Sequence, residues 1–233
     1  MPGPFASRPP VPLSAAMQIE GDYSMDGYAL VRGLVPRQVA DALMDMIRRR
    51  KLPDGIVPAV PDGLPLGVLT RNVYELYSEH FPPMKSFLWG LTPAMEQVTG
   101  RRLVPTYDYF RIYRQGDLCH VHRDRPACEH SLSLTLAYSD DAPWPLEVGG
   151  EGQSGPDELV AKDFGPEPVR ALSMNVGDAV AYRGVEHRHG RTMPNPNSWS
   201  AHLFLHWVDP QGPHAERAFD GKGTPEPVEL TFA

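Results

Sequence analysis

The sequence predicts a mainly β domain of the α+β class, with a jelly-roll barrel of short antiparallel strands after a set of N-terminal helices. Three observations indicate this fold. The 26 prolines and 21 glycines, together about a fifth of the 233 residues, favour turns and short strands. Apolar residues recur at helical spacing only in the first hundred residues, and alternation with a period of two begins near Leu103. Turn signals between short strands at such spacing are typical of a closed or two-sheet barrel.

Composition narrows the class of protein. Apolar residues make up 41% and charged residues 22%, as in globular domains. The net charge of −7 argues against a general nucleic-acid binder, because no strong basic field would attract phosphates. The chain has no run of apolar residues long enough for a membrane span, and its N-terminus does not resemble a secretory signal. With only two cysteines, we expect a reduced, cytoplasmic protein; the sequence gives no indication of its oligomeric state.

The chain divides into an N-terminal arm and one domain. Residues 1–18 contain five prolines and little periodic apolar signal, so we expect a flexible arm. The domain is expected over 19–233, with a helical cap at about 36–100, a β core at about 103–210 and a C-terminal tail. The cap should hold helices over 36–50, 71–79 and 84–99, packed on one face of the barrel. A proline- and glycine-rich loop over 53–67 is long enough to act as a lid or substrate wall.

Strands are expected on both sides of the cap. A short apolar strand, 28–34, should precede the first helix. After Leu103, tyrosines alternate with Asp, Phe and Ile through 107–113, and Ser or Thr alternates with Leu through 131–138. Further strands are expected at 146–148, 171–175, 179–182 and 201–208, and a histidine-rich strand at 182–191.

Two histidine-rich stretches carry the candidate chemistry. His122 and Asp124 are two residues apart on a predicted strand, so both side chains point to the same face. A third ligand would come from His187 or His189, which strand parity alone does not separate. Two imidazoles and one carboxylate form the facial triad of non-haem Fe(II) oxygenases, which leaves positions open for cosubstrate and dioxygen. Tyr113, nine residues before His122, can face the same cavity and donate its hydroxyl to a carboxylate ligand.

These motifs resemble the prolyl 4-hydroxylase-like branch of the Fe(II)/2-oxoglutarate-dependent dioxygenases. The resemblance rests on Tyr113-x-x-Gly116, His122-x-Asp124, Gly177-Asp178, the stretch 182–191 (YRGVEHRHGR) and the strand 204–208 (FLHWV). The resemblance covers roughly residues 105–208. The predicted strand at 28–34 also resembles the strand with which the family's domain usually begins. The resemblance implies a double-stranded β-helix fold and His122, Asp124 and His189 as the iron ligands. It also implies Fe(II), 2-oxoglutarate and O2 as cofactor and cosubstrates, and hydroxylation coupled to decarboxylation of 2-oxoglutarate to succinate.

The sequence departs from this family at one position. The family usually places an arginine or lysine for the distal carboxylate of 2-oxoglutarate nine to eleven residues after the last ligand, where this chain has 198–200, Ser-Trp-Ser. Arg191 is the preferred substitute, because a guanidinium binds a carboxylate in bidentate fashion. His202 is the second candidate; Arg111 and Arg183 are less favoured. The departure also leaves an alternative, a metal-binding barrel without 2-oxoglutarate turnover, such as a cupin-like dioxygenase or a ligand-binding protein.

The substrate is expected to be an amino acid, a peptide or a related small metabolite. A carboxylate at position 124 argues against halogenation, because related halogenases have a small residue there and bind chloride. Arg125, Glu129 and Trp144 are candidate substrate contacts, but Arg125 and Glu129 could equally form a structural ion pair, and Trp144 could simply pack in its turn. The other histidines have ordinary interpretations: His206 in the core, and His80, His130 and His214 at the surface.

Overall fold

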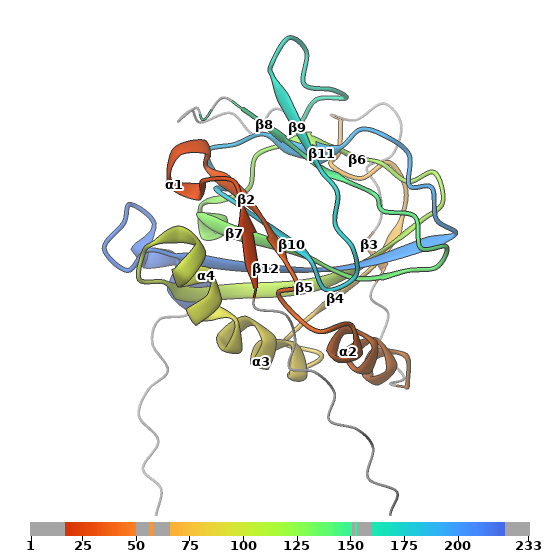
Figure 1. Ribbon diagram of the computed structural model, residues 1–233, viewed down its shortest axis with the longest axis horizontal. Helices are drawn as coiled ribbons and strands as arrows, with labels where there is room; N and C mark the ends of the chain where they lie inside the picture. The colour runs from red at the N-terminus through yellow and green to blue at the C-terminus, as the bar shows by residue number, and fades with distance from the viewer. Residues whose placement is uncertain (1–16, 50–55, 58–65, 151, 153–159, 222–233) are drawn as a thin grey trace, which may run out of the picture.

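The computed structural model describes residues 17–49, 56–57, 66–150, 152 and 160–221. Its described part contains an eight-stranded and a four-stranded sheet, both antiparallel, that face each other (Figure 1). The larger sheet runs in the order β1 (Gln18–Glu20), β2 (Tyr28–Arg32), β10 (Ala179–Tyr182), β7 (His130–Tyr138), β12 (Trp199–Val208), β5 (Val104–Arg114), β4 (Val73–Tyr77) and β3 (Ile56–Val57). The smaller sheet runs β6 (Cys119–His122), β11 (His189–Arg191), β8 (Leu146–Gly149) and β9 (Val169–Leu172).

The helices are short. The α-helices are α1 (Tyr23–Asp26), α2 (Arg37–Arg49), α3 (Pro83–Gly90) and α4 (Thr92–Thr99), and two 3-10 segments are η1 (Pro126–Cys128) and η2 (Ala215–Gly221). Figure 1 shows α2, α3 and α4 on the side of the larger sheet that faces away from the smaller sheet. None of the helices in the described part is long and apolar enough to cross a membrane.

The alternating sequence of β7 explains how the larger sheet separates two environments. Leu132, Leu134 and Leu136 belong to the main hydrophobic core, together with buried residues of α2, α3 and α4. Ser131, Ser133 and Thr135 point to the opposite face, toward the smaller sheet, and are also fully buried. Strand β12 follows the same rule, because successive side chains of a strand point to opposite faces. The barrel therefore has an apolar outer face under the helices and a polar interior.

One predicted helix is wrong. Residues 71–79 form strand β4, which pairs antiparallel with β5 from Tyr74↔Ile112 to Tyr77↔Tyr109. Val73, Leu76 and Tyr77 have helical spacing, but the same stretch also alternates, with Val73 and Glu75 on one face and Tyr74 and Leu76 on the other. Pairing with β5 selects the strand over the helix. A strand at 73–77 satisfies backbone groups along the edge of β5, which a helix at this place would leave unsatisfied.

The helix predicted over 84–99 is two helices. Helix α3 ends at Gly90 and α4 begins at Thr92, with Pro93 in its first turn, where a proline is tolerated but cannot continue a preceding helix. Gly100 ends α4 in the left-handed conformation with φ 68°, and its N–H donates to the carbonyl of Glu96, as predicted for a helix stop. Residues 1–16 of the arm expected over 1–18, most of the 53–67 loop and the C-terminal tail from 222 lie outside the described residues. Gln18, at the end of the expected arm, already belongs to strand β1.

Strand register brings the two histidine-rich stretches together. In the smaller sheet, His189 on β11 pairs directly with His122 on β6. In the larger sheet, β12 lies between β7 and β5, so His206 is opposite Ser131 and Ser200 is opposite Tyr113. Side chains from five strands thus converge on the polar interior of the barrel.

Candidate metal centre and active site

His122, Asp124 and His189 form a compact cluster with metal-ligand geometry. One ligand atom from each lies within 4.8 Å of the others. Oδ1 of Asp124 is 3.7 Å from Nε2 of His122 and 3.5 Å from Nε2 of His189. The two imidazole centroids are 4.4 Å apart. Two imidazole nitrogens and one carboxylate oxygen that can occupy one face of a metal ion are the donor set of a facial triad.

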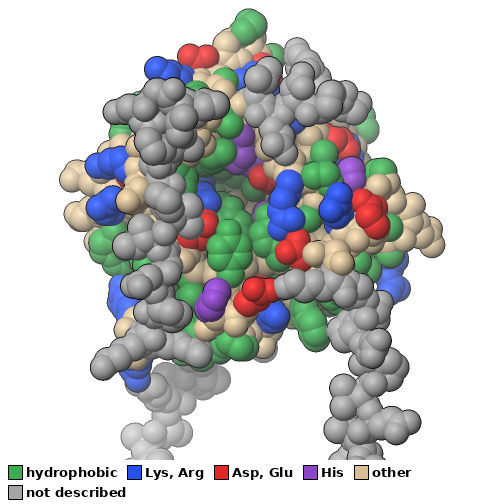
Figure 2. All heavy atoms as spheres, turned by 180° about the vertical axis from the view of Figure 1, so that it is seen from behind, with side chains coloured by type: hydrophobic (Ala, Val, Ile, Leu, Met, Phe, Trp, Pro, Cys, Tyr) green, Lys and Arg blue, Asp and Glu red, His purple; other side chains and the backbone are tan. Residues whose placement is uncertain are grey.

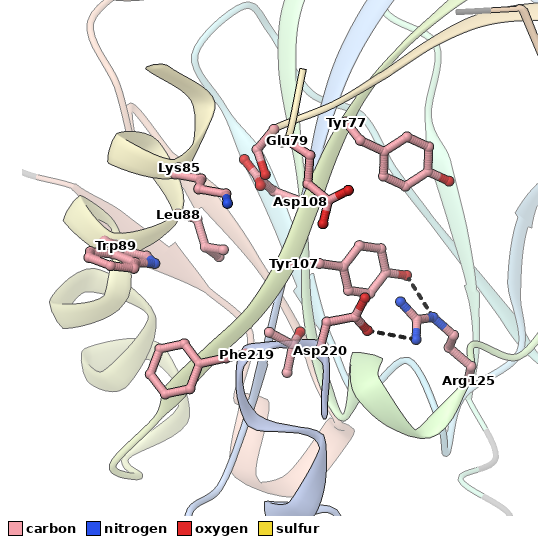
Figure 3. A pocket seen from close by; sticks show the side chains of 12 residues that line it. Tyr77, Glu79, Lys85, Leu88, Trp89, Tyr107, Asp108, Arg125, Phe219 and Asp220 are labelled. Atoms are coloured by element: carbon pink, nitrogen blue, oxygen red, sulfur yellow. Dashed lines mark hydrogen bonds and ion pairs between the residues drawn. The ribbon is translucent and has the colours of Figure 1, made fainter. Parts of the chain in front are cut away.

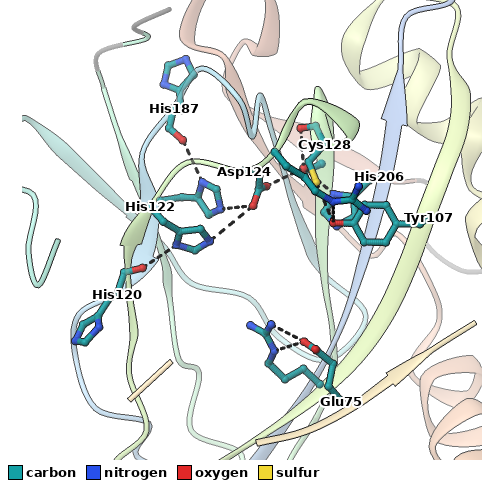
Figure 4. A network of polar contacts seen from close by, with 12 residues as sticks. Glu75, Tyr107, His120, His122, Asp124, Cys128, His187 and His206 are labelled. Carbon is teal, nitrogen blue, oxygen red and sulfur yellow. Dashed lines mark hydrogen bonds and ion pairs between the residues drawn. The ribbon is translucent and has the colours of Figure 1, made fainter. Parts of the chain in front are cut away.

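Backbone contacts orient both imidazoles (Figure 4). Nδ1 of His122 lies 2.8 Å from the carbonyl oxygen of His120, and Nδ1 of His189 lies 3.1 Å from that of His187. A carbonyl can only accept, so Nδ1 carries the proton in each ring and Nε2 has a free lone pair. Both free lone pairs face Asp124. Such contacts from the far ring nitrogen fix the orientation of metal-binding histidines.

Burial also favours the neutral form of the His122 ring. Burial lowers the pKa of His122 to about 4, and the neighbouring His189 adds to this effect, so the His122 ring is neutral near pH 7. Burial alone would raise the pKa of Asp124, but the pKa is lowered overall, so the carboxylate is ionised. His122 and Asp124 keep 15% of their side-chain surface exposed, against 4% for His189, so the cluster opens on the side of the first two.

The geometry separates His187 from His189. The expected continuous strand at 182–191 is not formed: β10 ends at Tyr182, a turn follows in which the N–H of His187 donates to the carbonyl of Arg183, and β11 begins at His189. His187 lies in this turn, and its Nδ1 is 2.8 Å from the carbonyl oxygen of Gly149, away from Asp124. The parity argument fails here because a turn interrupts the strand.

Asp124 is supported on its second oxygen. The hydroxyl of Ser131 lies 3.2 Å from Oδ2 of Asp124 and 2.9 Å from Nδ1 of His206. Cys128, which is a free thiol, lies with Asp124 and His206 in a second group of candidate ligand atoms. Burial raises the pKa of the Cys128 thiol well above its usual value, which disfavours the thiolate that a metal would need.

Arg191 lies in the barrel interior, two residues beyond His189. It is 1% exposed, and its Nη2 is 3.4 Å from the hydroxyl of Ser133 on β7. Its Nε is buried and has no hydrogen-bond partner among the described residues. The guanidinium lies 4.9 Å from the ring of Trp144 and 6.0 Å from that of Tyr113. A buried guanidinium without a carboxylate at hydrogen-bond distance can bind an anion.

The other arginine of the interior already has a partner. Arg111 forms an ion pair with Glu75 on β4, and its Nη1 donates to the hydroxyl of Tyr113 at 2.8 Å. Tyr113 is fully buried, so its pKa is raised despite the neighbouring Arg111 charge, and its hydroxyl stays protonated. Tyr113 therefore offers a hydroxyl donor to the same interior as Arg191.

His202 and the Ser-Trp-Ser segment lie around this end of the barrel. Burial lowers the pKa of His202 well below its usual value, so His202 is a neutral donor or acceptor and not a cation. Its ring lies beside Ser200 and Thr135. Trp199 points to the helices, where Arg48 lies 5.2 Å from its ring. Of the two candidates preferred for the distal carboxylate, only Arg191 supplies a positive charge.

The three candidate substrate contacts lie in different places. Arg125 pairs with Asp220 at 2.9 Å and not with Glu129, which accepts from the backbone N–H of Asp209. Of the two alternatives left open for Arg125, the ion pair with Glu129 is therefore not formed. Trp144 is fully buried, donates its indole N–H to the carbonyl of Met193 and contacts Tyr113 edge-on, so it forms a wall of the barrel interior beside Arg191.

His130 was expected at the surface and is buried instead, with its Nδ1 2.7 Å from the hydroxyl of Tyr23. Sequence analysis also missed Ser131, Ser133 and Tyr182, whose ring lies 4.5 Å from that of His189. The serines had a signal, since they occupy the polar positions of an alternating strand. Tyr182 opens the stretch 182–191 that carries the resemblance, but its contact with His189 could not be predicted, because that contact depends on the turn that follows Tyr182.

Comparison with known proteins supports the fold. No protein-family model and no curated protein matches the chain. Among solved structures, it resembles the non-heme α-ketoglutarate-dependent epimerase SnoN of nogalamycin biosynthesis, with 13% identity over 90% of this chain and 92% of that chain and a TM-score of 0.62. It also resembles a Pseudomonas putida prolyl-4-hydroxylase (15% identity, 81% and 95% coverage, TM-score 0.54). A third is HygX of Streptomyces hygroscopicus with nickel and 2-oxoglutarate bound (10% identity, 80% and 84% coverage, TM-score 0.55).

The fold is therefore that of the 2-oxoglutarate/Fe(II) oxygenases, the double-stranded β-helix. Within that fold, the similar structures include a prolyl-4-hydroxylase, in agreement with the predicted resemblance.

Proposed function

We propose that this chain is an Fe(II)- and 2-oxoglutarate-dependent oxygenase that oxidises a small organic substrate, with hydroxylation as the reaction. The observation that carries the proposal is the cluster of His122, Asp124 and His189, in which both free Nε2 lone pairs face one carboxylate oxygen. Two neutral imidazoles and one carboxylate suit Fe(II), and this set leaves half of an octahedral shell for exogenous ligands. The donor set thus fits the ion that the fold implies.

The second part of the proposal is a 2-oxoglutarate site between the triad and Arg191. Two residues of a strand span about 6–7 Å, so His189 and Arg191 are separated by roughly the length of a five-carbon dicarboxylate. The buried Nε of Arg191 would bind the distal carboxylate together with the hydroxyls of Tyr113 and Ser133. His202 would act as a neutral neighbour. A buried guanidinium binds an anion strongly because little water competes for it.

The protein residues have separate tasks in this reaction. His122, Asp124 and His189 would hold iron, and Ser131 would keep the Asp124 carboxylate in place. Iron and 2-oxoglutarate, when bound, would supply the activation of dioxygen and the oxidising power. The apolar rings of Trp144 and Tyr182 would exclude water from the interior, so that oxidation is directed to the bound substrate.

The substrate would approach from the open side of the triad, where His122 and Asp124 retain exposed surface. Figure 2 shows a hollow with hydrophobic side chains at its centre and histidine, basic and acidic side chains around them. Structures of similar fold contain small molecules, hygromycin B in HygX and nogalamycin RO in SnoN, which supports a small-molecule substrate. An amino acid or peptide remains within the proposed class, and the carboxylate at Asp124 supports hydroxylation over halogenation.

An anaerobic titration with Fe(II) and then 2-oxoglutarate tests the proposal. A weak visible charge-transfer band that saturates with 2-oxoglutarate is expected, followed by succinate formation when oxygen is admitted. Arg191→Met should bind iron but lose the band at the same 2-oxoglutarate concentration. Arg188→Met is the matched control, because Arg188 points out of the barrel toward Glu167. Iron binding without any 2-oxoglutarate response in the unaltered protein would favour the alternative, a metal-binding barrel without 2-oxoglutarate turnover.

A further inference from the structure

His206 lies beside the candidate metal centre, although it is not one of the three residues assigned to the metal. It is 1% exposed, and strand register places it on β12 directly opposite Ser131 on β7. Figure 4 shows Asp124 between His122 on one side and His206 on the other. The ring of His206 therefore lies on the side of the Asp124 carboxylate that faces away from the candidate metal position.

The two oxygens of Asp124 have different neighbours. Oδ1 is 3.7 Å from Nε2 of His122 and 3.5 Å from Nε2 of His189. Oδ2 lies 3.2 Å from the hydroxyl of Ser131, and the same hydroxyl lies 2.9 Å from Nδ1 of His206. Only Oδ1 is therefore directed to the two imidazole lone pairs, while Oδ2 belongs to a chain of hydrogen bonds that ends at His206.

The neighbours of the Ser131 hydroxyl determine which way these hydrogen bonds run. The hydroxyl lies 3.2 Å from the carbonyl oxygen of Cys128 as well as from Oδ2 of Asp124, and both of these oxygens can only accept. Of its three polar neighbours, only Nδ1 of His206 can donate to the serine oxygen. With the proton on Nδ1, Ser131 accepts from His206 and donates to Asp124. A proton on Nε2 instead would direct the single hydroxyl hydrogen to His206 and away from Asp124.

The ring of His206 is fixed in place by Tyr107. The two rings stack with their centroids 4.6 Å apart, and the guanidinium of Arg125 lies 4.1 Å from the centre of the Tyr107 ring. Tyr107 and Arg125 also line a cavity of about 510 Å³ beside the barrel, and His206 is not one of the described residues that line it (Figure 3). Nε2 of His206 is buried and has no hydrogen-bond partner among the described residues. The contact of Nδ1 with Ser131 is thus the one hydrogen bond through which this ring acts on the described part of the chain.

A second metal ion between Asp124, Cys128 and His206 fits these contacts less well. One candidate ligand atom of each residue lies within 4.8 Å of the others. The hydroxyl of Tyr107, however, lies 3.1 Å from Sγ of Cys128, and burial raises the pKa of this thiol, whereas a metal needs the thiolate. The hydroxyl of Ser131 also lies at hydrogen-bond distance from both Oδ2 of Asp124 and Nδ1 of His206. The contacts of His206 are those of a residue that supports a ligand.

We propose that His206 is a positioning residue of the metal centre: through Ser131 it keeps Oδ2 of Asp124 turned away from the metal, so that the carboxylate offers Oδ1 alone. A carboxylate that binds through both oxygens would occupy a fourth position, whereas one that binds through a single oxygen leaves three positions for cosubstrate and dioxygen. This inference rests on the metal centre of the proposed function. It does not depend on the 2-oxoglutarate site at Arg191.

Cobalt(II) titration of the full chain tests the proposal without cosubstrate or turnover. Co(II) binds sites of this kind at least as tightly as Fe(II), and its visible spectrum changes with the number and arrangement of its ligands. His206→Leu and Ser131→Ala should each alter this spectrum and weaken Co(II) binding by at least about tenfold, since a ligand loses the partner that orients it. The double variant should bind Co(II) no more weakly than Ser131→Ala alone, because both changes break the same chain.

Two variants of His206 separate its hydrogen bond from its packing. His206→Asn should restore most of the Co(II) affinity and the spectrum of the unaltered protein, because the amide nitrogen of asparagine can take the place of Nδ1. His206→Gln places its amide near the position of Nε2, so it should behave like His206→Leu, and it keeps the comparison possible if the leucine variant does not fold. His130→Leu is the matched control, because His130 is also buried, with Nδ1 2.7 Å from the hydroxyl of Tyr23 and Nε2 without a described partner. It should leave Co(II) affinity and spectrum unchanged.

Four results would overturn the proposal. These are an unaltered Co(II) affinity and spectrum in His206→Leu, equal losses in His206→Asn and His206→Leu, losses that add in the double variant, and an equal effect of His130→Leu. Failure of the proposed function has a different signature: the unaltered protein would bind Co(II) or Fe(II) and show no response to 2-oxoglutarate, while the ranking of the His206 variants would still hold.

Discussion

Replacing Asp108 with asparagine should stabilise the fold, and the gain should depend on pH. The pKa of this carboxyl is raised to about 6 from an ordinary value of 3.8, chiefly by burial. The native state therefore binds the proton more tightly than the unfolded chain does. The sign follows: the carboxyl lowers stability as pH rises between about 4 and 6, and its full cost is present above the folded-state pKa.

The magnitude follows from the size of the shift. A difference of about 2 pKa units corresponds to about 3 kcal/mol of unfolding free energy at 1.36 kcal/mol per unit. Asparagine is isosteric and uncharged, but its buried amide also needs partners, so we expect a gain of about 1–3 kcal/mol at pH 8. For a domain of this size, that gain raises the midpoint of thermal unfolding by roughly 3–10 °C.

Thermal unfolding followed by circular dichroism between pH 4 and pH 8 measures this effect. The Asp108→Asn variant and the unaltered protein should differ most at pH 8 and converge toward pH 4. Asp41→Asn is the control, since Asp41 is exposed and forms only a weak contact with Arg37 at 3.9 Å. A destabilised Asp108→Asn variant at pH 8, or a gain that is constant with pH, would refute the reasoning and indicate that the carboxylate has a stabilising partner.

The remaining predictions concern the candidate metal centre. His189→Ala should abolish Fe(II) binding measured by anaerobic titration, whereas His187→Ala should lower it only slightly, and the reverse order would contradict the assigned triad. Gly184→Ala should weaken iron affinity by at least about tenfold, because the new Cβ would lie 2.4 Å from Oδ2 of Asp124 and displace the carboxylate. Gly90→Ala, where a Cβ meets nothing within 4 Å, is its control, and equal iron affinity in the two variants would contradict the steric argument.

Local patterns were sufficient for part of the fold and the site. The alternation of Ser and Leu in 131–138 predicted β7, and the two-residue spacing of His122 and Asp124 predicted their common direction. The stretch 71–79 was misassigned because its apolar residues fit both periods, and only pairing with β5 selects the strand. Local sequence could not show the turn that separates His187 from β11 or the contact of Arg191 with Ser133, because both depend on segments distant in sequence.

The two faces of β7 and β12 have a consequence for how this protein can change. Leucines and alanines on one face pack against the helices, while serines, threonine and histidines on the other face line the polar interior of the barrel. Neighbouring residues of one strand therefore have different functions: one packs against the helices and the next lines the barrel interior. Single substitutions on the interior face can change the shape of the polar interior for a new ligand, while the helix-facing residues of the same strand keep their packing. Ligand preference and folding stability can thus vary separately within a strand of nine or ten residues.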